Sequence, residues 1–125
     1  MPNTVVDSIR THGLEKYLNC IGYVSHEEAI AYQKRSQLLV LIEINSEDTK
    51  AIIPGKLFEY MISETPLIAI GPEESDVEKI IISTNTGAYF NYSEKQKLGC
   101  NFYSIAKNTY NIPPVFILTI YDFPF

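Results

Sequence analysis

Residues 53–72 read IPGKLFEYMISETPLIAIGP, and this stretch decides the fold class. Residues 56–64 carry apolar side chains at helical spacing, which predicts a helix with one buried face. Pro66 blocks the continuation of that helix. Residues 67–70, Leu-Ile-Ala-Ile, form a continuous apolar run, which is typical of a strand buried on both faces of a parallel sheet. The stretch therefore predicts a helix followed by a buried strand.

Three other runs in the sequence have the chemistry of strands. Residues 38–42, LLVLI, form a second continuous apolar run, and we expect this strand also to be buried on both faces. Residues 20–24 and 88–92 are runs of apolar and aromatic residues that we also expect to form strands. Residues 45–53 have no clear period and are expected to form a loop.

Two helix starts carry the same signature, a serine followed three residues later by a glutamate. Ser25 and Glu28 form one such pair, and they predict a helix over residues 26–35. Ser75 and Glu78 form the other, directly before a run rich in isoleucine. In each case the serine oxygen can accept from the glutamate amide, and the glutamate side chain can return to the serine amide. Both pairs therefore predict a complete capping box.

The two ends of the chain are less regular. Residues 5–18 have apolar residues at roughly helical spacing, with Gly13 weakening the middle of the predicted helix. Residues 102–110 are compatible with a helix, which Pro113 and Pro114 would end. Residues 115–121, VFILTIY, are β-branched and aromatic, and we expect them to form a strand that completes the sheet, in this chain or in a partner. The alternative is a floppy tail with incidental hydrophobicity.

Strands and helices thus alternate from residue 20 to residue 92, which is the pattern of βαβ units. The expected fold class is α/β: a Rossmann-like parallel sheet with helices on both faces. Residues 1–93 would form this domain, incomplete at its N-terminal side. Residues 94–125 would form an atypical C-terminal tail that contributes a helix and a strand to the same domain.

Composition argues against several classes of function. The chain has 125 residues, the size of one domain, and a net charge of −5, which argues against nucleic acid as a partner. Cys20 and Cys100 match no metal-ligand spacing and indicate no disulfide framework, so we expect no metal, no cofactor and a reducing cytoplasm. The N-terminus lacks the pattern of a signal peptide, and no apolar run approaches the ~20 residues of a transmembrane helix.

The most informative loop ends at Pro54-Gly55-Lys56. In an open α/β sheet, ligands bind beyond the carboxyl ends of the strands, where this loop leads. Gly55 has no Cβ, so a phosphate can come close, and the amides that open the next helix carry partial positive charge. Lys56 adds a full charge, and Glu59 lies one turn further on the same face. This arrangement suits a nucleoside diphosphate, although an ordinary capped helix with solvated Lys56 and Glu59 has the same pattern.

Two further polar residues follow predicted strands. His26 lies near the same crevice and could contact a phosphate or a pyrimidine, or it could simply be a first-turn residue of a capped helix. Glu43 directly follows the strand at 38–42 and could meet a sugar, but carboxylates at strand ends are commonly solvated.

The order of these segments resembles the C-terminal, donor-binding domain of GT-B glycosyltransferases similar to the group-1 (family 4) enzymes. The resemblance covers about residues 5–92, and its most specific part runs from Pro54 to Pro72. It implies a transferase that recognises a nucleotide-diphosphate sugar of the UDP or GDP type and serves polysaccharide or glycan assembly in bacteria. Such an enzyme would act in the cytoplasm or at the inner surface of the membrane.

The resemblance also implies roles for individual residues. Lys56 would lie near the donor diphosphate, and Glu59 would bind the ribose hydroxyls. Pro54, Gly55 and Leu57 would line the same nucleotide-sugar site, together with His26. Gly22 and Tyr23 match a turn beside the nucleotide base.

Two departures from the family bear on activity. An earlier glutamate of the family falls on Ala51 here, so we do not expect that family contact with the donor sugar. The acceptor-binding half of the family's enzymes is missing, so we expect the isolated chain to be inactive and to need a partner chain or self-association. The alternatives are a non-catalytic remnant or interaction module with the same fold, and a flavodoxin-like or receiver-type domain. A receiver would need clustered acidic residues at an early strand end, and none are so placed.

Overall fold

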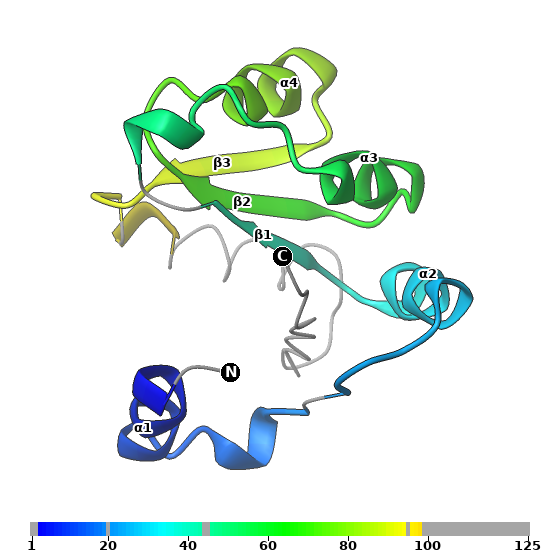
Figure 1. Cartoon of the computed structure of the whole chain (residues 1–125), viewed down its shortest axis with the longest axis vertical. Helices are drawn as coiled ribbons and strands as arrows, with labels where there is room; N and C mark the ends of the chain where they lie inside the picture. The colour runs from blue at the N-terminus through cyan, green and yellow to red at the C-terminus, as the bar shows by residue number, and fades with distance from the viewer. Residues whose placement is uncertain (1–2, 20, 44–45, 95, 99–125) are drawn as a thin grey trace.

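The structure, a computed structural model, describes residues 3–19, 21–43, 46–94 and 96–98 (Figure 1). Its centre is a parallel sheet of three strands, with β2 between β1 and β3. The strands are β1 (Leu39–Ile42), β2 (Leu67–Gly71) and β3 (Gly87–Asn91). Leu39 lies opposite Leu67, and Ile70 lies opposite Phe90. The α/β class expected from the sequence is confirmed.

The described part of the chain also contains helices. They are α1 (Asn3–Thr11), α2 (His26–Arg35), α3 (Gly55–Ile62) and α4 (Asp76–Thr84), with two short 3-10 turns, η1 (Glu15–Tyr17) and η2 (Glu47–Thr49). α3 connects β1 to β2, and α4 connects β2 to β3. Figure 1 shows both connecting helices on the same side of the sheet. Because a helix crosses over between each pair of neighbouring strands, the strands can pair in parallel, as the alternation of strands and helices in the sequence predicts.

The core lies between the sheet and these two helices. Strand residues at alternate positions supply one half of it, because successive side chains point to opposite faces. The helices supply the other half at helical spacing. The buried members of this cluster are Leu39, Leu41, Leu57, Tyr60, Leu67, Ala69, Val77 and Ile81. This packing fixes where the first turns of α3 and α4 lie.

The two segments that precede α2 differ from their predictions. Residues 21–24 form no strand, so the expected strand at 20–24 is wrong for the part that the structure describes. Gly22 has a φ of 72°, a left-handed conformation that interrupts an extended chain. The single helix expected over 5–18 is also wrong, because α1 ends at Thr11 and Gly13 has a φ of 63°. No residue of α1 is buried.

The predicted burial of the strands is correct for β2 and wrong for β1. In β2, Leu67, Ile68 and Ala69 are all buried. In β1, burial alternates along the strand, and Ile42 is 65% exposed. The loop predicted at 45–53 is correct in outline, with η2 as its one turn of helix among the described residues.

One capping box is complete and the other is half formed. At α2, Glu28 N donates to Ser25 Oγ at 3.2 Å, and Ser25 N donates to the Glu28 carboxylate at 3.0 Å. At α4, Glu78 N donates to Ser75 Oγ at 3.1 Å, but the Glu78 carboxylate accepts from Glu74 N instead. Both serines cap their helices as expected.

The helix expected at 102–110 and the strand expected at 115–121 lie outside the described residues, so both stay predictions. Within the described ranges, none of the helices has the length and apolar character needed to cross a bilayer.

Candidate functional site at the start of α3

The first turn of α3 differs from an ordinary helix start. Pro54 occupies the N-cap position with extended backbone, and it makes no side-chain hydrogen bond to the turn. The turn also contains no acidic residue. A methyl group added at Gly55 would meet nothing within 4 Å, so the space beside this backbone is open within the described structure. A helix start of this kind keeps its partial positive charge available to an anion.

Lys56 adds a cation to this positive helix end. Its side chain is partly buried, and its Nζ lies 5.9 Å from the centre of the Tyr60 ring. Partial burial lowers the pKa of Lys56, and the nearby Glu59 carboxylate opposes that shift. The positive charge of a lysine in the first turn interacts unfavourably with the positive end of the helix dipole. An anion bound at this turn would stabilise both the lysine charge and the helix end.

Glu59 lies one turn further along α3, and each of its carboxylate oxygens faces a residue of α2. Oε1 is 3.8 Å from His26 Nδ1, and Oε2 accepts a hydrogen bond of 3.3 Å from Gln33 Nε2. The Glu59 side chain is 36% exposed and that of His26 is 71% exposed. Three of the predicted site residues, His26, Lys56 and Glu59, therefore lie together on two neighbouring helices.

The other predicted residues lie in different environments. Gly22 occupies a left-handed turn and Tyr23, which follows it, is 79% exposed, so an aromatic face is available before α2. Leu57 is fully buried in the core, and its amide N donates to Pro54 O at 3.0 Å. Its side chain therefore supports α3 instead of lining an open site.

The loop that carries Ala51 is tied to the neighbouring helix. Asp76 N, in the first turn of α4, donates to Lys50 O at 2.8 Å. The Lys50 ammonium pairs with the Glu47 carboxylate at 2.9 Å. Ala51 itself is exposed and contributes no acidic group to the entry of α3.

Sequence reasoning missed a buried polar cluster at the carboxyl end of β1. Glu43 was expected either to meet a sugar or to be solvated, and it is only 7% exposed. Its Oε2 lies 2.8 Å from the Tyr89 hydroxyl and 3.1 Å from Ser75 Oγ, and its backbone oxygen accepts from the Tyr92 hydroxyl. Burial raises the pKa of Tyr89, and the Glu43 carboxylate raises it further, so the phenol stays protonated and can donate.

Gly71 makes this cluster sterically feasible. A Cβ at Gly71 would come within 2.3 Å of Glu43 Oε2 and 2.4 Å of the Tyr89 hydroxyl oxygen. The cluster thus joins residues at the carboxyl end of β1 and from β3 to the N-cap of α4, and Gly71 at the end of β2 leaves room for it. Only the placement of Glu43 at a strand end gave a signal in the sequence.

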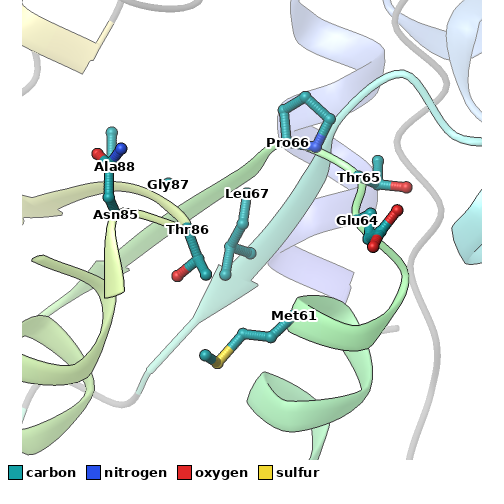
Figure 2. Close-up of a pocket in the computed structure, with 9 residues that line it drawn as sticks. All are labelled: Met61, Glu64, Thr65, Pro66, Leu67, Asn85, Thr86, Gly87 and Ala88. Atoms are coloured by element: carbon teal, nitrogen blue, oxygen red, sulfur yellow. The ribbon is translucent and has the colours of Figure 1, made fainter. Parts of the chain in front are cut away.

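A pocket of about 470 Å³ lies at the opposite end of the sheet (Figure 2). Its lining comes from the end of α3, the turn after it, and the starts of β2 and β3: Met61, Glu64, Thr65, Pro66, Leu67, Asn85, Thr86, Gly87 and Ala88. None of the predicted site residues lines it. Ligands of open α/β sheets bind beyond the carboxyl ends of the strands. The candidate site is placed at the start of α3, because His26, Lys56 and Glu59 come together there.

The described residues contain no group of three or more His, Cys, Asp or Glu side chains that could hold a metal ion. Comparisons with protein-family models, with curated proteins and with solved structures found no match for this chain. The chemistry of the site therefore has to be argued from its own residues.

Proposed function

We propose that this chain binds a nucleotide-diphosphate sugar at the start of α3, as the donor-binding half of a GT-B-type glycosyltransferase in polysaccharide or glycan assembly. The observation that carries the proposal is an uncapped helix start with Lys56 and Glu59 one turn apart. The resemblance of residues 54–72 to the family supports the choice of ligand class.

The diphosphate would contact the first turn of α3. The start of α3 has no side-chain cap, so the helix dipole favours an anion there, and the Lys56 ammonium would add a charge-assisted hydrogen bond. Open space beside Gly55 lets a phosphate oxygen approach the backbone. During glycosyl transfer, the same groups would stabilise the negative charge of the leaving diphosphate.

The ribose would contact Glu59. A carboxylate accepts hydrogen bonds from two neighbouring hydroxyls, which suits the 2′ and 3′ positions of a ribose. Its distance of one helical turn from Lys56 matches a ligand that carries a diphosphate next to a sugar. The exposed Tyr23 ring, before α2, is available to stack on the base.

Transfer would need a second chain or a second copy that supplies the acceptor site. Both substrates have to be held in attack geometry, and the described residues at the start of α3 would contact the donor alone. We therefore expect donor binding without transfer by the isolated chain. A cytoplasmic place, at the inner surface of the membrane during assembly, belongs to the same proposal.

The second candidate is a non-catalytic interaction module with the same fold. Ala51 favours it, because it stands where the family carries an acidic residue for the donor sugar. This module would keep the nucleotide contacts at most, and it would not distinguish a nucleotide sugar from the free nucleotide. The two candidates therefore differ in their affinity for the sugar.

Calorimetric titration tests the proposal. We would titrate UDP, GDP, their sugars and uridine into the chain and into Lys56→Ala. The variant should weaken UDP binding about tenfold or more and leave uridine binding almost unchanged, because a hydrogen bond to a charged group contributes about 1.5–3 kcal/mol.

Lys79→Ala is the matched control for this titration. Lys79 lies in the first turn of α4, where its Nζ pairs with Asp76 at 2.9 Å. This variant removes the same charge from a capped helix and should bind UDP like the native chain. Equal losses of UDP and uridine affinity in Lys56→Ala would refute the phosphate contact.

A further inference from the structure

Gln33 is a buried polar side chain that connects α2 to the candidate site. It is 1% exposed, although glutamine is usually a surface residue. Its Nε2 donates to Glu59 Oε2 at 3.3 Å across the α2–α3 contact. A buried amide is costly unless it is hydrogen-bonded, so losing this contact would carry a free-energy penalty.

The backbone of Gln33 is held as well. Thr65 Oγ1, after the end of α3, donates to Gln33 O at 2.9 Å, and Thr65 is 8% exposed. The last turns of α2 are therefore attached to the segment between α3 and β2. This attachment involves the backbone of Gln33 and is separate from the contact of its side chain with Glu59.

The two carboxylate oxygens of Glu59 have different neighbours. Oε2 faces the buried amide of Gln33, whereas Oε1 faces the exposed ring of His26 at 3.8 Å. A glutamate on a helix surface normally samples several rotamers, and ordering it costs conformational entropy when a ligand binds. A carboxylate that is already held avoids this cost.

We propose that Gln33 is a positioning residue that holds Glu59 with Oε1 presented to the ribose, so that the site selects nucleotides with ribose hydroxyls over deoxynucleotides. This inference rests on the proposed function, and it adds the residue that makes Glu59 selective. Gln33 acts through Glu59 and does not itself touch the ligand.

The test compares the affinities for UDP and for the diphosphate of 2′,3′-dideoxyuridine. Their ratio isolates the contribution of the ribose hydroxyls. We expect the ratio to fall about five- to tenfold in Gln33→Met, which removes the amide donor with little change of volume. On a Glu59→Ala background, Gln33→Met should cause no further fall, because the two side chains act as one unit.

Thr65→Val is the matched control. It removes the hydrogen bond to Gln33 O from the same packed region, and it leaves the contact between Gln33 and Glu59 in place. We expect it to lower the melting temperature by an amount similar to that of Gln33→Met, with an unchanged affinity ratio. An equal fall of the ratio in both variants would show that Gln33 matters only for stability, and would overturn the inference.

The variant Glu59→Gln is a second test of the same inference, and it leaves Gln33 unchanged. In this variant the Gln33 amide would bind the new carbonyl oxygen, so the new NH₂ group would face the ligand. The affinity ratio should then fall towards that of Glu59→Ala. A native ratio in Glu59→Gln would mean that residue 59 is free to turn its oxygen to the ribose, which overturns the positioning role.

The outcomes separate this inference from the proposed function. If Glu59→Ala lowers the ratio and Gln33→Met does not, only the role of Gln33 is wrong. If Glu59→Ala itself leaves the ratio unchanged, the ribose contact is wrong and the positioning role falls with it.

Discussion

The start of α3 and the starts of α2 and α4 follow opposite rules. Ser25 and Ser75 cap their helices, and glutamates and an aspartate occupy those first turns. α3 begins after Pro54 with no side-chain cap, no acidic residue and Lys56 in the first turn. The helix starts of α2 and α4 therefore follow the usual capping and charge preferences, whereas the start of α3 does not. Such a departure is expected at functional sites, where a ligand supplies what the sequence leaves out.

Substitutions at two glycines can test the difference between the helix starts of α3 and α4. Gly71 lies against the buried Glu43 cluster, where a Cβ would collide with Glu43 and Tyr89. Gly55 lies at the uncapped start of α3, where a Cβ would meet nothing within 4 Å. One glycine is thus required by packing within the described structure, and the other is not.

Gly71→Ala should have the largest effect on stability. The new methyl group would force Glu43 and Tyr89 apart, and such overpacking costs about 3 kcal/mol or more when hydrogen-bonded groups must move. Urea unfolding would measure the loss as a lower midpoint with an unchanged slope. A native midpoint would mean that the cluster at the carboxyl ends of the strands is not rigid.

Removing the serine caps should have intermediate effects that differ between the two helices. Ser75→Ala should cost about 2 kcal/mol, because Ser75 is fully buried and contacts Glu43 and Tyr89 as well as the helix amide. Ser25→Ala should cost about 1 kcal/mol, because that cap is exposed. Thermal unfolding of both variants checks the order, and a larger loss for Ser25→Ala would contradict this account of the cluster.

Gly55→Ala should have the smallest effect on stability and an opposite sign. Alanine fits the helical backbone there and reduces the entropy of the unfolded chain, so the variant should gain about 0.5 kcal/mol. The methyl group would nevertheless hinder the approach of a phosphate, so UDP binding should weaken. A more stable variant that binds UDP with native affinity would show that the ligand does not approach this backbone.

Local patterns predicted most of this fold, and contacts between distant residues account for what they missed. The serine pairs at 25 and 75 and the apolar run at 67–70 act within a few residues, so the sequence reveals them. The run at 20–24 was misread because the left-handed backbone of Gly22 overrides its apolar composition.

The candidate site shows the same division. Lys56 and Glu59 could be identified from their spacing on one helix. The contact of Gln33 with Glu59 spans 26 residues, and that of Tyr89 with Glu43 spans 46 residues. No local period encodes such pairs, so Gln33 was not recognised and Glu43 was expected either to meet a sugar or to be solvated.

The most direct test of the central claim is the shift of backbone amide resonances when UDP is added to the full chain. If the uncapped start of α3 holds the diphosphate, the amides of Gly55 and Lys56 should shift strongly and saturate with the calorimetric affinity. The amides of Val77 and Lys79, in the capped first turn of α4, serve as the internal control and should remain nearly unchanged. Shifts confined to α4, or no saturable shift at Gly55, would contradict the account.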